Sequence, residues 1–342
     1  MKIALDATYS LGRHLSGVGV YSREMMSGLA AAHANADFEY CYRPHRFLRS
    51  FQQTLPGNVR RRLLWSGLAG DADVFHGLNQ RVDDRRWRRI VTTFHDLFVL
   101  SAEYSTAEFR HRFTEQARGA AERSDLIIAV SEFTARQVVE LLGVDRERIR
   151  VVHHGVHARA AASTSGAREN VILFVGAIQK RKNLDHLVRA FEGTARGWKL
   201  VLAGSTGFGG ERILQKIERS RRRSDIEVTG YIPDATLERW YARARVFAFP
   251  SLDEGFGMPV LDAMARGVPV LTSNRSALPE VAGDAALLVD PENEDEIAVA
   301  LMRLTSDERL RDDLALKGLA RSAGFSWEAA VEKTWSVYGE VS

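Results

Sequence analysis

The stretch VFAFPSLDEGFGMPVLDAMARGVPV (246–270) decides the fold of the second half of the chain. It opens on an apolar run that predicts a buried strand, and it leads into another such run, PVLTS (269–273). Between them stand Gly255 and Gly257, which permit backbone shapes that a Cβ would forbid, and Pro259, which suits the first turn of a helix. The stretch therefore predicts a strand, a glycine turn, a helix and a second strand.

The same alternation of short apolar runs with longer helical patterns extends over most of the chain. The expected strands lie at 2–7, 73–78, 89–97, 124–132, 148–156, 171–177, 199–205, 226–232, 246–251, 269–273 and 285–290. The expected helices lie at 18–32, 132–143, 183–195, 211–220, 235–244, 260–267 and 325–340. Strands that alternate with helices predict parallel sheets covered on both faces, and the series restarts once. The fold class expected is α/β, with two doubly wound, Rossmann-like domains facing each other across a cleft.

The break between the two series is HARAAASTSGAREN (157–170), which is small, polar and without periodicity. It predicts a linker, with domains at 1–160 and 161–325 and a final helix at 326–342. Ligands of such sheets bind beyond the carboxyl ends of the strands, so polar residues at those ends become the candidate site residues.

Composition excludes several classes of protein. The chain has 342 residues, of which 45% are hydrophobic and 27% charged, as in globular proteins. No apolar run approaches the roughly 18 residues that span a bilayer, and the start MKIALDATYS lacks a signal-peptide core. Cys41 is the single cysteine, so no internal disulfide can form. We expect a cytoplasmic protein.

Basic residues are concentrated early in the chain, although the net charge is only +3. Apolar and aromatic side chains lie among them, which leaves two interpretations: solvated surface, or a face that rests on anionic lipid or a phosphorylated partner. We predict peripheral attachment to the inner face of the cytoplasmic membrane through Arg60, Arg61, Arg62 and Trp65. No nucleic-acid-binding signature is present. The arginines concerned are Arg43, Arg46, Arg49, Arg60, Arg61, Arg62, Arg85, Arg86, Arg88 and Arg89.

The turn EGFGMPVLD (254–262) carries carboxylates at both ends. Glu254 is expected at the strand tip and Asp262 about one turn into the helix, with free N–H groups between them that suit phosphate. Carboxylates accept hydrogen bonds from sugar hydroxyls, so the combination suits a nucleotide sugar. The alternative is an ordinary strand–helix turn with two solvated acids. The candidate donor-binding residues of the turn are Glu254, Gly255, Phe256, Gly257, Met258, Val260 and Asp262.

A second group follows the first strand of the second half, in FVGAIQKRKN (174–183). Arg181 and Lys182 are expected in the loop after that strand, where adjacent cations could hold a diphosphate and stabilise it as a leaving group. The chain has no D-x-D sequence to hold a divalent ion against a diphosphate. His153, His154 and His157 lack cysteine or acidic partners at ligand spacing, so we predict no metal site.

Two weaker signals lie in the first half. Gly17 and Gly19 open the first helix, but their spacing is not that of a dinucleotide-binding fingerprint. His95 and Asp96 end an apolar run, TTFHDL (92–97), where a strand would deliver them to the cleft.

Taken together, these stretches resemble the retaining GT-B glycosyltransferases of family GT4, near bacterial mannosyltransferases of polysaccharide assembly. The resemblance runs nearly end to end and is most specific over 228–270. It implies transfer of a sugar from a nucleotide donor to an acceptor hydroxyl with retained anomeric configuration and no metal or other cofactor. It also implies that the last helix crosses back onto the first domain.

The resemblance assigns roles by position. Glu254 would contact hydroxyls of the transferred sugar, Asp262 the donor ribose, and Arg181 and Lys182 the diphosphate. The catalytic candidates are then Glu254, His95, Lys182 and Arg181. Gly17 and Gly19 would close over the phosphates, and the backbone at Tyr231 and Ile232 would hold the base.

Two positions depart from the family pattern. Position 262 is Asp rather than Glu, shorter by one methylene, so the ribose contact would be looser or made through water. Ala177 stands where many members carry Arg, which leaves more of the phosphate charge to Arg181 and Lys182.

The function predicted is transfer of mannose from GDP-mannose to a saccharide or a polyprenyl-diphosphate-linked acceptor. UDP-glucose, UDP-GlcNAc or a deoxysugar nucleotide are alternative donors. A sugar-nucleotide epimerase and a non-catalytic saccharide- or lipid-binding protein are the alternative functions.

Overall fold

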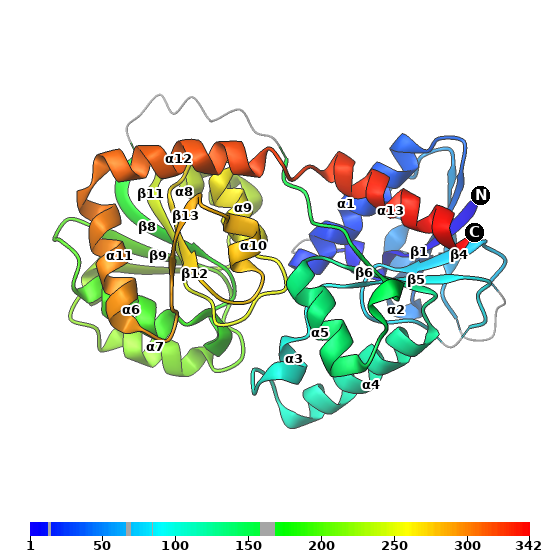
Figure 1. Ribbon diagram of the computed structural model, residues 1–342, viewed down its shortest axis with the longest axis horizontal. Helices are drawn as coiled ribbons and strands as arrows, with labels where there is room; N and C mark the ends of the chain where they lie inside the picture. The colour runs from blue at the N-terminus through cyan, green and yellow to red at the C-terminus, as the bar shows by residue number, and fades with distance from the viewer. Residues whose placement is uncertain (13–14, 66–69, 84, 158–167) are drawn as a thin grey trace. The chain divides into compact units, whose positions relative to one another are not determined.

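The computed structural model describes residues 1–12, 15–65, 70–83, 85–157 and 168–342. The chain divides into two compact units, coloured by position in the chain in Figure 1. The first unit comprises Met1–Gly155 with Phe325–Ser342, and the second comprises Val156–Gly324. Most of the predicted linker, with the predicted boundary at 160–161, lies outside the described residues.

The first unit is built on a seven-stranded sheet in the order β3-β2-β1-β4-β5-β6-β7, and all its strand pairs are parallel. Its strands are β1 (Lys2–Asp6), β2 (Asp37–Tyr42), β3 (Val59–Leu63), β4 (Val74–Gly77), β5 (Ile90–Phe94), β6 (Leu126–Ala129) and β7 (Ile149–Val151). Its helices are α1 (Gly17–Ala32), α2 (Pro44–Ser50), α3 (Phe98–Ser101), α4 (Ala107–Arg123), α5 (Glu132–Leu142) and α13 (Trp327–Val341), with 3-10 turns η1 (Ala7–Ser10) and η2 (Arg146–Arg148).

The period of two along each strand sends alternate side chains to opposite faces of this sheet. Ile128 of β6 packs in a cluster with residues of α1 and α13, whereas its neighbours Ile127 and Ala129 pack with residues of α4 and α5. Both faces are therefore covered by helices, as the continuous apolar runs of the strands require.

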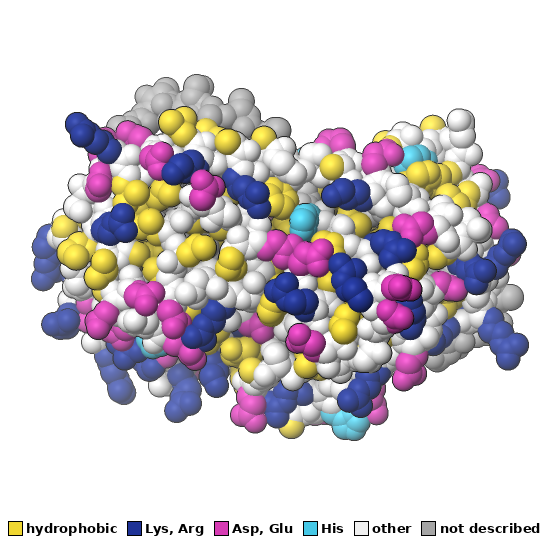
Figure 2. Space-filling model, in the orientation of Figure 1, with side chains coloured by type: hydrophobic (Ala, Val, Ile, Leu, Met, Phe, Trp, Pro, Cys, Tyr) yellow, Lys and Arg dark blue, Asp and Glu magenta, His cyan; other side chains and the backbone are white. Residues whose placement is uncertain are grey.

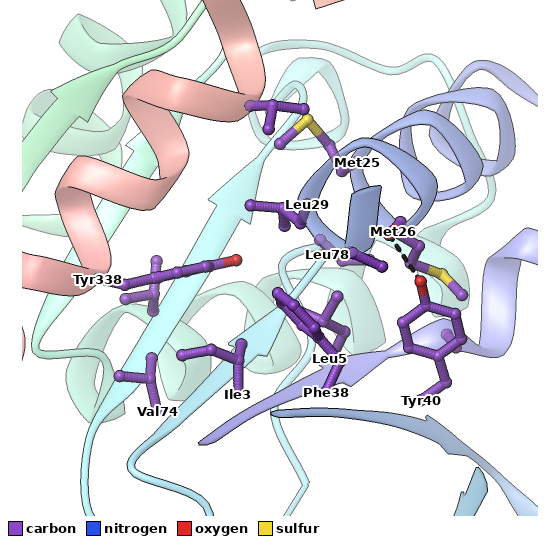
Figure 3. Packing of buried hydrophobic residues seen from close by; sticks show 14 of the residues in the cluster. Ile3, Leu5, Met25, Met26, Leu29, Phe38, Tyr40, Val74, Leu78 and Tyr338 are labelled. Carbon is purple, nitrogen blue, oxygen red and sulfur yellow. Dashed lines mark hydrogen bonds between the residues drawn. The ribbon is translucent and has the colours of Figure 1, made fainter. Parts of the chain in front are cut away.

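The final helix α13 completes the core of the first unit. Figure 3 shows Tyr338 of α13 among Ile3 and Val74 of the sheet, with Leu29 of α1 close by. A Cβ at Gly28 of α1 would lie 2.5 Å from Val331 Cγ2, so the glycine allows α1 and α13 to approach closely. The last 18 residues thus contribute to the core of the unit that begins at residue 1.

The second unit is built on a six-stranded sheet in the order β10-β9-β8-β11-β12-β13, again with parallel pairs throughout. Its strands are β8 (Glu169–Val175), β9 (Lys199–Ala203), β10 (Ile226–Gly230), β11 (Ala244–Phe249), β12 (Val270–Ser273) and β13 (Ala286–Val289). Its helices are α6 (Leu184–Glu192), α7 (Gly210–Glu218), α8 (Asp234–Arg243), α9 (Met258–Met264), α10 (Leu278–Ala282), α11 (Glu294–Ser306) and α12 (Glu308–Ser322), with 3-10 turns η3 (Lys180–Lys182) and η4 (Arg223–Asp225).

The order of this second sheet decides where the site forms. β8 and β11 are neighbours at its centre and run parallel. The segments that follow them, 176–183 and 250–257, therefore emerge at the same edge of the sheet, although they are about 70 residues apart in sequence. Within the described residues, the structure contains no helix both long and apolar enough to cross a membrane.

Candidate functional site

Three charged side chains meet beyond the ends of β8 and β11. Arg181 Nη1 lies 3.0 Å from Glu254 Oε2, and Lys182 Nζ donates a hydrogen bond to Glu254 Oε1. All three residues are buried, with at most 8% of each exposed. The structure thus brings together Glu254 and the two cations of η3, Arg181 and Lys182, which the sequence predicted to share one site.

Backbone hydrogen bonds hold these loops in place. The amide of Leu252 donates to the carbonyl of Arg181 at 2.9 Å, and the Arg181 guanidinium donates to the carbonyl of Asp253. On the other side, the amide of Glu254 donates to Ser276 Oγ at 3.1 Å. The charged groups are therefore fixed by the fold before any ligand arrives, which is the condition for electrostatic stabilisation at low reorganisation cost.

The electrostatics of the site keep the carboxyl group ionised. Burial would raise the pKa of Glu254, but the charges of Arg181 and Lys182 outweigh it and lower that pKa to about 2. Lys182 Nζ also lies 4.6 Å from the centroid of the Phe249 ring, within cation–π distance. The site therefore presents two cations and one carboxylate at neutral pH.

The turn after Glu254 has the predicted order of strand, glycine turn and helix. Gly257 adopts φ 108°, and a Cβ there would lie 2.7 Å from Leu278 Cδ2. Pro259 stands in the first turn of α9, as predicted. Phe256 and Val260 are buried, and the Val260 amide donates to the carbonyl of Gly257, so the side chain and amide of Val260 belong to the core of the unit.

Asp262 lies on α9 and is held by a residue that the sequence analysis missed. Arg266 Nη1 donates to Asp262 Oδ1 at 2.9 Å, and its Nη2 and Nε donate to Glu238 at 2.6 and 3.0 Å. Asp262 and Arg266 are four residues apart, a spacing that brings side chains together on a helix. Glu238 comes from α8, which no local pattern connects to α9.

The predicted base-binding positions lie on the loop between β10 and α8. Tyr231 follows Gly230, which adopts φ 67°, and is 42% exposed. Ile232 is half-buried. Both belong to the same unit as the charged cluster of Arg181, Lys182 and Glu254.

The remaining predicted site residues belong to the first unit. His95 directly follows β5, and its Nε2 lies 2.9 Å from the carbonyl oxygen of Leu78. Burial lowers the pKa of His95 to about 4, so the imidazole is neutral at neutral pH. Gly17 is the first residue of α1, and a Cβ at Gly19 would lie 2.9 Å from the carbonyl oxygen of Tyr9. The close packing of α1 against η1 therefore accounts for Gly19.

His95 is part of a buried aromatic group in the first unit. Its ring packs edge-on against Tyr21 at 4.7 Å and stacks on His154 at 5.4 Å. Burial also lowers the pKa of His76 to about 3, and its Nδ1 lies 2.6 Å from the hydroxyl of Tyr338.

In the part of the chain that the structure describes, no three His, Cys, Asp or Glu side chains are grouped so as to hold a metal ion.

Acids of the first unit pair with about half of the arginines in the basic early stretch, counted over the described residues. Arg62, one of the predicted membrane contacts, is paired with Glu39 at 2.7 Å and with Asp71 at 2.5 Å. Arg61 donates to the carbonyl of Ser50 at 3.2 Å and lies over the ring of Phe51. On the face drawn in Figure 2, basic side chains are interspersed with acidic ones. Ion pairs also engage Arg43, Arg85, Arg88 and Arg89.

A cavity of about 630 Å³ opens in the first unit. None of the residues predicted to bind the donor is among the described residues that line it. Its lining includes Arg43, Pro44, Leu64, Trp65, Arg81 and Arg123.

Comparisons with known families cover nearly the whole chain. Residues 15–159 match the model for Glycosyltransferase Family 4, and residues 159–320 match the model for Glycosyl transferases group 1. Together the two models extend from the start of α1 to the last turns of α12. The chain is also similar to the O-antigen chain mannosyltransferase B of Escherichia coli, at 29% identity over 99% of both proteins.

Solved structures support the same architecture. The sucrose-phosphate synthase of Thermosynechococcus elongatus superposes with a TM-score of 0.80 at 19% identity, covering 99% of this chain and 98% of that one. HepE of Anabaena, solved in complex with UDP-glucose, superposes with a TM-score of 0.77 at 16% identity over 99% and 100% of the two chains. At these identities the likeness establishes the fold, two Rossmann-like domains of the GT-B type. The chain therefore belongs to the glycosyltransferases, and it joins a family 4 domain to a group 1 domain.

Proposed function

We propose that this glycosyltransferase transfers mannose from GDP-mannose, with retention of configuration, to a saccharide or lipid-linked saccharide acceptor of cell-surface polysaccharide. The observation that carries the proposal is the buried cluster of Arg181, Lys182 and Glu254 beyond the ends of β8 and β11. Two fixed cations suit a diphosphate, and an ionised carboxylate suits sugar hydroxyls. Mannose is favoured because a relative aligned over 99% of both proteins is named as a mannosyltransferase.

The reaction proposed needs no covalent enzyme intermediate. The acceptor hydroxyl oxygen forms a bond to the anomeric carbon on the face from which the diphosphate leaves, and the bond between that carbon and the diphosphate oxygen breaks. The leaving diphosphate takes the hydroxyl proton, and Arg181 and Lys182 balance its charge without a metal ion. Glu254 orients the sugar, and the loop at Tyr231 and Ile232 holds the base. His95, Gly17 and Gly19 remain predicted contributors from the first unit.

Donor identity is tested by mixing the purified enzyme with GDP-mannose, UDP-glucose, UDP-GlcNAc or a deoxysugar nucleotide and measuring the thermal melting temperature and slow hydrolysis. We expect GDP and GDP-mannose to protect the enzyme most, and only GDP-mannose to be hydrolysed measurably. If UDP raised the melting temperature more than GDP did, the donor would be a UDP-sugar and not GDP-mannose. Protection without hydrolysis or transfer to any acceptor would favour a non-catalytic binding protein, and conversion of the donor itself would favour an epimerase.

We further propose that the enzyme works at an anionic membrane, through a surface on and beside α2. Residues 43–65 contain six arginines and no acidic residue. Three large apolar side chains of this segment are exposed: Leu48 by 82%, Phe51 by 61% and Trp65 by 55%. We call Leu48, Arg49, Phe51 and Trp65 the α2 surface. Of the contacts predicted from the sequence, which were Arg60, Arg61, Arg62 and Trp65, this surface keeps Trp65. Arg61 and Arg62 are engaged within the unit, and Arg60 lies on the opposite face of β3 from Arg61.

The α2 surface is tested by sedimentation with vesicles. Burial of each large apolar side chain contributes about 1.5–3 kcal/mol, so the double change Leu48→Ser and Phe51→Ser is expected to lower binding to vesicles with phosphatidylglycerol at least about tenfold. Leu316 of α12 is 69% exposed in the second unit, and Leu316→Ser is the matched control. The proposal would be contradicted if the double variant and the Leu316→Ser control bound vesicles equally. It would also be contradicted if binding of the wild type did not depend on anionic lipid or on salt.

A further inference from the structure

Arg266 lies at the centre of a three-residue network on the surface of the second unit. Its guanidinium donates to both oxygens of Glu238, at 2.6 and 3.0 Å, and to Oδ1 of Asp262, at 2.9 Å. A fourth bond, of 2.6 Å, reaches the carbonyl of Asp262. The guanidinium carbon lies 4.7 Å from the centroid of the Tyr241 ring. Arg266 thus links Glu238 of α8 to Asp262 of α9. Together these contacts hold the plane of the guanidinium group in one orientation.

The arginine and the two acids differ in their exposure. The Arg266 side chain is only 13% exposed, whereas those of Glu238 and Asp262 are 32% and 38% exposed. Burial would lower the pKa of Arg266, but its bonds to Glu238 and the charge of Asp262 raise it. A permanently charged, anchored arginine therefore lies beneath carboxylates that remain open to solvent.

An aspartate at position 262 gains from such an anchor. A glutamate could reach a ligand with its longer side chain, whereas Asp262 must be held where the ligand arrives. Fixing a side chain before binding removes the entropy that it would otherwise lose in the complex. The fork on Glu238 fixes Arg266, and Arg266 in turn fixes the carboxylate of Asp262.

We propose that Arg266, anchored by Glu238, is a positioning residue that holds Asp262 against the ribose hydroxyls of the donor. The inference rests on the proposed function and on the role that the family resemblance implies for Asp262, contact with the donor ribose. It adds that affinity for the ribose depends on two residues that touch no ligand. Donor binding, rather than the chemical step, is then the quantity that Arg266 controls.

The test is calorimetric binding of GDP and of 2′,3′-dideoxy-GDP to the wild type and to Arg266→Gln. Loss of a positioned hydrogen bond to a charged group is expected to weaken GDP binding about tenfold or more. Binding of the dideoxy nucleotide should stay within about twofold, because it has no hydroxyl for Asp262 to hold. In turnover assays the same variant should raise KM for the donor and leave kcat nearly unchanged.

Arg243→Gln is the matched control. Arg243 of α8 forms a two-point ion pair with Glu169, at 2.7 and 2.9 Å, and lies 4.4 Å from the Trp240 ring. It therefore has the same kind of contacts as Arg266 at another place in the same unit. We expect this variant to bind both nucleotides as the wild type does.

Equal losses for GDP and dideoxy-GDP in Arg266→Gln, or no loss for either, would overturn the inference. In an Asp262→Ala background, Arg266→Gln should add no further loss, and an added loss would overturn it as well. Failure of the proposed donor gives a different result, because the wild type would then bind UDP in place of GDP. The comparison of ribose with dideoxyribose applies unchanged to UDP.

Discussion

Replacing Glu254 with glutamine is expected to lower sugar transfer about 10²–10³-fold, the size of effect that follows removal of one fixed electrostatic contact at a reaction centre. Glutamine keeps the size of the side chain but removes the charge that Arg181 and Lys182 share. The sugar hydroxyls would lose the carboxylate that accepts their hydrogen bonds. Arg181 and Lys182 would lose the carboxylate that holds them in place.

The same substitution should also destabilise the second unit. Breaking a buried ion pair by removing one partner costs about 3–5 kcal/mol, because an uncompensated charge stays buried. Activity must therefore be measured on protein shown to be folded, by circular dichroism and thermal melting. Glu169→Gln, which breaks an exposed ion pair with Arg243, should alter neither quantity appreciably. A folded Glu254→Gln enzyme with nearly normal turnover would show that the carboxylate does not handle the sugar.

Replacing Lys182 with methionine is expected to lower turnover by a similar factor, about 10²–10³, while leaving the fold intact. Methionine keeps the unbranched chain that packs beside Phe249, and Glu254 stays paired with Arg181 at 3.0 Å. The charge removed is the one assigned to the leaving diphosphate, so kcat should fall more than KM rises.

Lys180→Met provides the control for this prediction. Lys180 belongs to the same 3-10 turn, but its side chain is exposed. The two variants change net charge equally, within two residues of each other. If both lowered turnover alike, general attraction of the donor would explain the result, and Lys182 would have no special part in it.

The sequence predicted the central strands and the glycine turn because these residues satisfy local rules. The strands β8 and β11 contain the continuous apolar runs VILFV (171–175) and VFAF (246–249), as strands covered on both faces do. Gly257 and Pro259 mark a turn into a helix through their own backbone preferences. The meeting of the two charged loops follows from the parallel order of the sheet.

Elements at the edge of the first sheet could not be predicted in the same way. β3, with the sequence VRRRL, is an edge strand whose three arginines lie at its partly exposed surface. Such a segment does not alternate between apolar and polar residues, so its sequence predicts a charged loop rather than a strand. α2 is only seven residues long, too short for a helical period to show.

The ion-pair networks could not be predicted from the sequence either. Arg62 finds Glu39 and Asp71, and Arg266 finds Glu238, through pairings that join separate elements. The run of arginines therefore predicted an open basic face, although about half of these arginines are paired with acids within the described residues. Only the spacing of Asp262 on α9 and Arg266 in the turn just after it, four residues apart, was a signal that could have been found.

The most direct measurement is a crystal structure of the enzyme with GDP-mannose bound. The account predicts diphosphate oxygens within about 3 Å of the Arg181 and Lys182 nitrogens, as in charge-assisted hydrogen bonds, and mannose hydroxyls on the Glu254 carboxylate. A diphosphate bound elsewhere on the second unit, with the ion pairs of Glu254 undisturbed and no sugar beside them, would contradict it.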